Sequence, residues 1–383
     1  MQSLVKTDRR TLRIAAAVLA CAVIALAASA WVAAAPAPAA GPVERSLGKL
    51  QNRHQISKHR QRWALKVYKK ARVLSASLNK PIRGSSPRAR AKRDRVKVRR
   101  GPMKWQVRMI QRMARQGRIS ADRMAPLFTT LSNNTRWFRH NGPVAAGTDR
   151  RFGNSRIIFQ YFPGIGWQFH PLSNFAKLNA VWTVDTPPSR RAQRSYAREL
   201  IRWGVRRNGA LTWEYYFGFS GSPAPWISAI SQGTAMQALA RVGYRMHNRS
   251  MMRAAKYAAR SFNQPPSRGV RLRRDGGYHY LGYSGASKLI ILNMFLQSLN
   301  GMRTYYVLND DKHVRKLYRK GVAAAKVETP MFDTGSWSLY SLNGEKTDEH
   351  YHRLTIEFLD TLCKNTKEAV FCDTRDKFKS YLR

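Results

Sequence analysis

The chain begins with a short basic segment, which a long apolar stretch follows. An uninterrupted apolar stretch runs from Ile14 to about Ala35 and follows four cations within the first thirteen residues. This order is typical of an export signal, and the small residues at 28–30 and 33–35 fit an A-x-A cleavage site. Because the stretch is long enough to span a bilayer, an uncleaved anchor is the alternative. We therefore expect residues 1–35 to be a signal peptide or signal anchor, and the protein to be secreted or associated with the cell envelope.

Residues 36–102 are rich in proline and basic side chains. The Pro/Ala stretch Ala35–Pro42 predicts an extended tether, and the spaced apolar positions of 51–78 predict a helix with an Arg/Lys face. Pro, Ser, Gly and charged residues over 81–100 predict a flexible basic linker. We expect a basic Pro/Arg-rich tether and helix in this region.

From residue 103 onward, apolar positions recur mostly at helical spacing. Residues 104–113 and 124–131 predict a helical hairpin, whereas the aromatic and β-branched stretch 156–169 predicts short strands or extended loop. The aromatic, Gly- and Ser-rich segment 212–225 predicts a long loop that could form a cleft wall. Further helices are expected at 172–184, 189–205, 227–246 and 252–262.

The last third of the chain also predicts helices. Leu289–Leu299 is apolar on most faces, and Asn300 with Gly301 predicts a left-handed C-cap for it. Acidic residues after Asn309 and after Thr347 predict two more helix starts. Paired helices joined by loops of alternating length favour a mainly α fold in which 103–383 form an α/α toroid, an incomplete helical barrel, with a few short strands or extended loops before the toroid. A plain helical bundle is the alternative.

The charge balance indicates an anionic partner. The 383 residues contain 69 Lys and Arg against 21 Asp and Glu, a formal net charge of +48. Such a field favours nucleic acid, an anionic membrane or cell-wall surface, or an acidic glycan. Export argues against nucleic acid, so we expect an acidic polysaccharide, with a possible contact between the basic N-terminal region and a membrane or cell wall.

The cysteines and histidines indicate no metal or redox chemistry. Cys363 and Cys372 could form a local disulfide after export, or remain a buried free pair. His350 and His352 flank Tyr351, a spacing that places the imidazoles on different helix faces. The sequence contains no Walker loop, HExxH or CxxC motif, and we expect neither a metal nor a cofactor.

Several motifs follow one another in the C-terminal half. They are WISAISQGTAM at Trp226–Met236, Tyr283 followed ten positions later by Asn293, PMFDTGSWSLY at Pro330–Tyr340, and Tyr351–His352. In order and spacing they resemble the C-terminal domain of D-glucuronyl C5-epimerases, over about residues 203–383. The resemblance implies an isomerase that acts on glucuronate units of a heparosan-like or other glycosaminoglycan polymer.

The resemblance also implies site residues. It makes Tyr283, Tyr340 and Tyr351 the catalytic candidates, and the shared motifs make Gln232, Asn293 and Asp333 candidates for substrate binding. Epimerisation at C5 removes a proton α to a carboxylate and returns one on the opposite face, so a base and an acid must flank the ring.

The reaction also needs positive charge near the substrate. The carboxylate must be neutralised before C5 becomes acidic enough, and His352 and Arg353 are our candidates for that task. Arg353 could equally lie on a solvated helix face. The abundant Arg and Lys side chains are expected to favour the tyrosine phenolate.

Two other functions remain open from the sequence. A uronate lyase of the α/α toroid type would use the same carbanion but expel the C4 substituent. A non-catalytic polyanion-binding envelope protein is the other alternative, because Gly282 stands where the family has an acidic residue.

Overall fold

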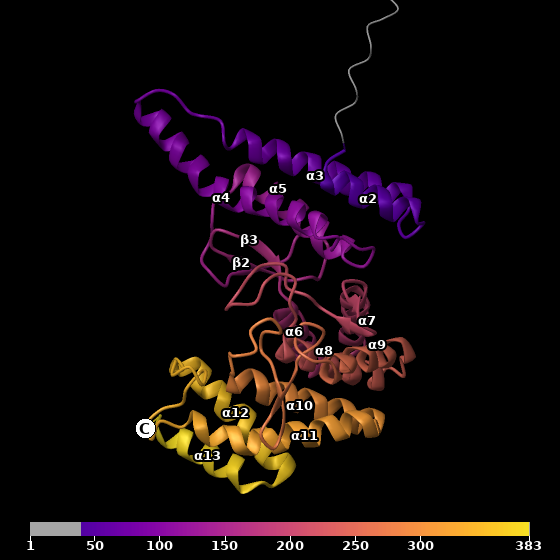
Figure 1. Ribbon diagram of the computed structural model, residues 1–383, viewed down its shortest axis with the longest axis vertical. Coiled ribbons are helices and arrows are strands. Elements are labelled where there is room, and N and C mark those ends of the chain that lie inside the picture. The colour runs from indigo at the N-terminus through magenta and orange to yellow at the C-terminus, as the bar shows by residue number, and fades with distance from the viewer. Residues whose placement is uncertain (1–39, 383) are drawn as a thin grey trace, which may run out of the picture.

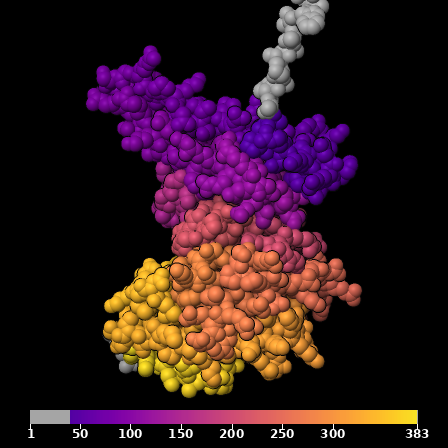
Figure 2. Space-filling view, viewed as in Figure 1, coloured from indigo at the N-terminus to yellow at the C-terminus, as the bar shows by residue number. Residues whose placement is uncertain are grey.

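The computed structural model describes residues 40–382, which are mainly helical as expected (Figure 1). The expected export signal at 1–35 lies outside the described residues. Within residues 40–382, no helix combines the length and apolar character needed to cross a membrane. In Figure 2 the N-terminal and C-terminal helices form two masses joined by a narrower middle.

Four helices form the N-terminal layer, coloured indigo to purple in Figure 1. Helix α3 packs against both α4 and α5, and α2 packs against α3 and α4. The end of α4 and the start of α5 form the expected hairpin. The four helices are α2 (Pro42–Asn52), α3 (Lys58–Ser77), α4 (Pro87–Arg115) and α5 (Met124–His140).

One expectation for this layer was confirmed over most of its range, and one was wrong. The helix expected at 51–78 forms as α3 from residue 58 onward, whereas the linker expected at 81–100 is largely the first half of α4. Ser86 accepts a hydrogen bond from the backbone N–H of Ala89, and Pro87 occupies the first turn, so the Ser-Pro pair starts a helix. The basic side chains that indicated a linker lie mostly on the exposed face of α4. The boundary expected after residue 102 therefore falls inside this helix.

A small antiparallel sheet lies below this layer. It comprises β1 (Asp149–Arg150), β2 (Phe159–Phe162) and β3 (Gly166–Phe169), so strands form within 156–169 as expected. Strand β3 is buried throughout and packs on α5. The Asn134 side chain exchanges two hydrogen bonds with the backbone of Trp167, at 2.9 and 2.7 Å, and this attaches the strand to α5.

The C-terminal helices alternate between two layers. Helices α6, α8, α10 and α12 pack side by side in chain order, and each packs against the helix that follows it. Figure 1 shows these helices in pink to yellow. They are α6 (Pro171–Trp182), α7 (Pro187–Arg202), α8 (Ala229–Arg245), α9 (Arg249–Ala259), α10 (Leu292–Asn309), α11 (Lys312–Glu328), α12 (Glu349–Thr366) and α13 (Ala369–Ser380). Two hairpins, β4 (Val205–Arg207) with β5 (Ala210–Thr212) and β6 (Arg271–Arg274) with β7 (Gly277–Tyr280), precede α8 and α10.

The C-cap expected at Asn300 and Gly301 was wrong, because α10 continues to Asn309. A Cβ atom on Gly301 would collide with the backbone of Gly233 in α8. The glycine therefore permits close packing of two helices and does not end one. The left-handed residue at the end of α10 is Asp310, with φ of 46°.

The next two helix starts were predicted correctly. The Asp311 side chain accepts a hydrogen bond from the backbone N–H of Val314 at the start of α11. Asp348 does the same for Tyr351 at the start of α12, with a distance of 2.8 Å. This cap sets the orientation of the first turn of α12, which carries Tyr351.

Cys363 in α12 and Cys372 in α13 form a disulfide across nine positions of sequence. Replacing both by Ser should lower the free energy of unfolding by about 2–3 kcal/mol, because the unfolded chain regains the freedom of a short loop. Urea unfolding of both proteins, with and without reductant, measures this difference. Equal stability of the two proteins under oxidising conditions would contradict the prediction.

Candidate functional site

A cavity of about 390 Å³ lies where the N-terminal ends of four helices meet. Its lining includes Ser173 from α6, Ser228 at the start of α8, Met294 from α10 and Tyr351 from α12. The N-terminal end of a helix carries a partial positive charge and unpaired backbone N–H groups. The backbone dipoles of these helices therefore contribute a positive potential to the cavity.

The loop between β5 and α8 forms an aromatic wall of this cavity, as expected for 212–225. Tyr215 stacks on Trp226 with ring centroids 4.1 Å apart and an interplanar angle of 7°. The backbones of these two residues also pair. Phe217 and Phe219 extend the wall toward Phe162 of β2. An aromatic wall of this kind suits the apolar face of a sugar ring.

Three tyrosines from three different elements line the cavity together. They are Tyr283, which follows β7, Tyr340, which lies in the loop before α12, and Tyr351 in the first turn of α12. The rings of Tyr340 and Tyr351 lie 5.5 Å apart, and the ring of Tyr283 lies 5.1 Å from that of Trp226. Tyr283 is buried at 6% exposure, whereas Tyr351 is 38% exposed. The expected catalytic residues thus share one site, with different access to water.

Burial raises the pKa of Tyr283, and a hydrogen bond from Tyr340 partly offsets this effect. Burial also raises the pKa of Tyr340, and its hydrogen bond to Tyr283 raises it further. Of the two hydroxyls, that of Tyr283 therefore ionises first, with Tyr340 as the donor that stabilises the phenolate. We expected Arg and Lys side chains to stabilise the tyrosine phenolate. This was wrong, because among the described residues neither type lines this cavity.

His170 is a lining residue that we did not select from the sequence. It is the N-cap of α6, and its Nδ1 accepts a hydrogen bond from the backbone N–H of Ser173 at 3.2 Å. Burial lowers the pKa of this imidazole to about 4, so the ring is neutral at pH 7. Because Nδ1 is an acceptor, the proton lies on Nε2 and is available for donation. His170 directly precedes Pro171 at the start of a predicted helix, and this position in the sequence could have indicated a helix cap.

His352 was a wrong expectation for substrate binding. Its side chain is fully buried and stacks on Trp337 with centroids 4.0 Å apart. One ring nitrogen donates to the backbone oxygen of Phe378 at 2.8 Å, and the other bonds with the Ser338 hydroxyl at 2.6 Å. Both nitrogens are occupied, so this histidine connects α12 to α13 and lies outside the cavity.

Arg353 also lies outside the cavity, contrary to the first expectation. It is exposed and forms an ion pair with Glu349, one turn earlier in α12, at 2.7 Å. Since α12 directs successive side chains to different faces, Tyr351 points into the cavity and Arg353 to solvent.

The three motif residues expected to bind substrate have structural roles instead. Gln232 accepts from the backbone N–H of Trp213 at 3.0 Å and donates to the Leu211 oxygen at 3.1 Å. Asn293 is buried and accepts from the backbone N–H of the next residue at 2.9 Å. Asp333 accepts from Gly335 at 2.9 Å and from the Tyr381 hydroxyl at 2.8 Å. None of the three lines the cavity.

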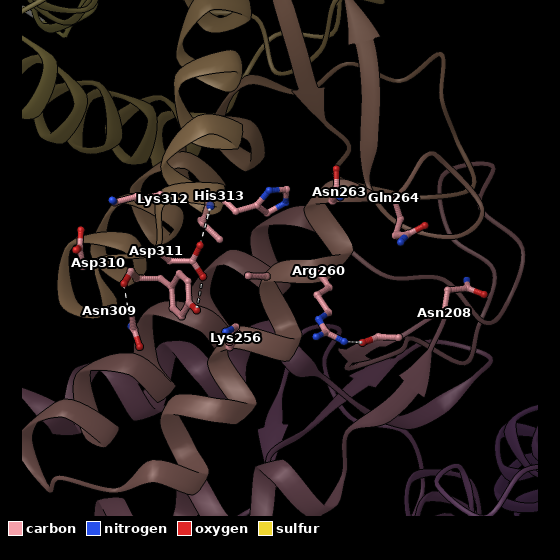
Figure 3. A pocket seen from close by; sticks show the side chains of 14 residues that line it. Asn208, Lys256, Arg260, Asn263, Gln264, Asn309, Asp310, Asp311, Lys312 and His313 are labelled. Atoms are coloured by element: carbon pink, nitrogen blue, oxygen red, sulfur yellow. Dashed lines mark hydrogen bonds between the residues drawn. The ribbon is translucent and has the colours of Figure 1, made fainter.

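A larger cavity of about 830 Å³ lies near the other end of α10 (Figure 3). Met294 and Asn309, which line the two cavities, are fifteen residues apart in α10, or about 22 Å along the helix. Two charged side chains of the larger cavity already have protein partners. Asp311 caps α11 and accepts from Tyr305 at 3.0 Å, and Arg260 donates to the Gly209 oxygen at 3.2 Å. The cavity with the three tyrosines is therefore our candidate functional site.

Comparison with known proteins confirms the resemblance of the C-terminal half. Residues 207–380 match the family model described as D-glucuronyl C5-epimerase C-terminus. A D-glucuronyl C5-epimerase of Caenorhabditis elegans is 28% identical over 181 residues, which is 42% of this chain and 29% of the relative. An uncharacterised protein of Methanocaldococcus jannaschii is 23% identical over 159 residues, 39% of this chain and 52% of the relative. The chain thus spans less than a third of one relative and about half of the other.

Proposed function

We propose that this protein is an exported isomerase, and that it epimerises glucuronate units of an acidic polysaccharide at C5. The premise is that residues 207–380 are a C-terminal domain of the D-glucuronyl C5-epimerase family. The observation that carries the proposal is the meeting of Tyr283, Tyr340 and Tyr351 in one cavity. Tyr283 comes from a segment 57 residues before Tyr340, and Tyr340 and Tyr351 come from the loop before α12 and the first turn of α12, so their convergence supports a shared chemical role.

In the proposed mechanism, the Tyr283 phenolate is the base. The bond between C5 and its proton breaks, the proton moves to the Tyr283 oxygen, and the electron pair is delocalised into the substrate carboxylate. Tyr340, whose hydroxyl lowers the pKa of Tyr283, stabilises the phenolate before the transfer. Tyr351 then donates its hydroxyl proton to the opposite face of C5. Tyr351 is exposed and regains a proton from water, and Tyr283 releases the abstracted proton to water once the product has left the cavity, so both tyrosines return to their starting states.

Neutral donors supply the stabilisation for the negative charge that develops on the substrate carboxylate. The Nε2–H of His170 and the hydroxyl of Ser228, which makes no capping bond in α8, are two donors beside the helix ends. The converging helix dipoles add a positive potential inside this partly buried cavity, where electrostatic effects are stronger than in bulk water. This arrangement would replace the guanidinium that we expected at Arg353.

The architecture and the compartment are part of the proposal. The alternation of α6 to α13 between two layers supports an incomplete α/α toroid with the site at the N-terminal ends of its inner helices. The disulfide between Cys363 and Cys372 supports export, because such bonds persist in oxidising compartments. The basic N-terminal layer would then face an anionic polymer, cell wall or membrane surface.

Proton exchange at C5 is the direct test. The protein is incubated in deuterated water with a panel of glucuronate polymers, and deuterium at C5 is measured by NMR. Incorporation without ultraviolet absorbance supports epimerisation, whereas a new absorbance from an unsaturated product would show a lyase. Salt-sensitive binding with neither signal on any polymer would contradict the enzyme and favour the polyanion-binding alternative.

The exchange rate should increase with pH. Because the pKa of Tyr283 is raised above its usual value near 10, only a small fraction is ionised at pH 7. That fraction grows about tenfold for each pH unit below the pKa, so the rate should rise about a hundredfold between pH 7 and pH 9. Initial exchange rates, corrected with a Tyr283→Phe variant at each pH, measure this. A rate that is flat or falls above pH 7 would exclude a phenolate base.

A further inference from the structure

A third, smaller cavity lies on α4. It has a volume of about 260 Å³ and is lined on one side by Lys104, Arg108 and Arg112. These residues are four positions apart, so they share one face of the helix and span about 12 Å along its axis. The half-buried Trp105 lines the same cavity. A row of cations beside an aromatic ring is suited to an anionic sugar.

The three cations have no protein partner within residues 40–382. All are exposed, and none forms an ion pair or a side-chain hydrogen bond there. No acidic residue lines the cavity. Other arginines of α4 are used internally, as Arg99 and Arg100 donate to the backbone oxygens of Arg139 and Leu78. The cations of the α4 cavity therefore keep their charge available for an outside anion.

The α4 cavity adjoins the tyrosine cavity. The turn between β2 and β3 separates them, with Phe162 lining the tyrosine cavity and Gly164 lining the α4 cavity. The Gln106 amide donates to the Ile165 oxygen at 2.9 Å and thereby holds this turn against α4. Trp105 packs on the same hydrophobic cluster as Tyr283. A chain that leaves the tyrosine cavity across this turn would meet the three cations.

We propose that the α4 cavity is a binding subsite for an anionic sugar unit next to the reacting unit of the same polysaccharide. Lys104, Arg108 and Arg112 bind its carboxylate or sulfate, and the Trp105 ring contacts its apolar face. The proposal rests on the proposed function for the identity of the polymer. It adds a source of affinity outside the tyrosine cavity, where neither Arg nor Lys lines the wall.

The test removes the three charges together. The variant Lys104→Gln/Arg108→Gln/Arg112→Gln is compared with Arg88→Gln/Lys92→Gln/Arg95→Gln, which removes the same charge from exposed positions nearer the start of α4. Binding of a glucuronate polymer and of monomeric glucuronate, which has no neighbouring unit, is measured by calorimetry at low salt. The first variant should raise Kd for the polymer at least tenfold, with a small effect on the monomer, and the control variant should change neither much.

Exchange kinetics give a second readout. The first variant should raise KM for the polymer and leave kcat within about twofold, because the tyrosines are unchanged. Equal polymer Kd values for the two variants would overturn the subsite, even if exchange occurs. Loss of polymer affinity only in the first variant would support the subsite, even if no exchange is found and the proposed reaction fails. If the first variant lost binding to vesicles of anionic phospholipid but kept its polymer affinity, the α4 cavity would bind a membrane surface, and the proposal would be overturned.

Discussion

Replacement of Tyr283 by Phe should reduce C5 proton exchange by about a thousandfold, which is the range lost with a general acid or base. The change removes one hydroxyl and keeps the ring that contacts Trp226, at a centroid distance of 5.1 Å. The buried aromatic cluster should therefore stay intact. Deuterium incorporation into the best polymer substrate measures the loss, and calorimetry should show polymer affinity within about threefold of the unmodified protein.

The matched control is Tyr244→Phe. Tyr244 lies in the last turn of α8, is 58% exposed, and does not line the tyrosine cavity. This variant should exchange at the unmodified rate. Tyr340→Phe provides a graded comparison, because it removes the donor that stabilises the Tyr283 phenolate. If Tyr283→Phe kept more than a tenth of the exchange rate, Tyr283 would not be the base.

Replacement of Glu214 by Ala should lower the free energy of unfolding by about 3–5 kcal/mol, because it leaves two arginines without their buried partner. The carboxylate is fully buried and accepts two hydrogen bonds of 2.7 Å from Arg123 in a fork geometry. Arg207 approaches it at 3.4 Å, and the Tyr216 hydroxyl donates to it at 3.1 Å. Denaturation by urea, followed by circular dichroism, measures the difference.

The large effect follows from what this ion pair connects. Arg123 directly precedes α5 in the N-terminal layer, whereas Arg207 and Glu214 belong to the β4–β5 hairpin and the segment after it. Glu349→Ala is the control, since Glu349 pairs with Arg353 on the exposed face of α12. Exposed pairs contribute little, so this change should cost less than about 1 kcal/mol. Similar costs for the two variants would show that the Glu214 pair does not stabilise the fold.

The spacing of apolar residues along the sequence predicted most of the helices, because a helix buries one face and so repeats its apolar positions every three to four residues. The hairpin near 104–131, the strands within 156–169 and the caps at Asp311 and Asp348 follow from periodicity and capping chemistry. Gly301 was misinterpreted because Asn-Gly ends a helix in one context and permits close packing in another. Only contact with Gly233 distinguishes the two.

The residues of the candidate site were also predicted only in part from the sequence. The motifs identified the three tyrosines that the structure brings together, whereas the residues expected to bind the substrate carboxylate lie elsewhere. His352 is only one position after Tyr351, yet α12 directs it into the packing between α12 and α13. His170 comes from a segment more than a hundred residues before Tyr283 and lines the same cavity as that tyrosine. No spacing along the chain could reveal that pairing.

The amino-acid sequence by itself determined the helical character of the protein and its excess of positive charge, because these depend on residue type and on spacing within one segment. The three candidate tyrosines were implied by the resemblance of its motifs to those of D-glucuronyl C5-epimerases. The tertiary structure decided which side chains share a cavity with those tyrosines. It also decided that helix N-termini and a neutral histidine line the cavity in place of arginine or lysine, and that unpaired cations of α4 lie beside it. These properties arise from packing between distant segments, and no single segment contains them.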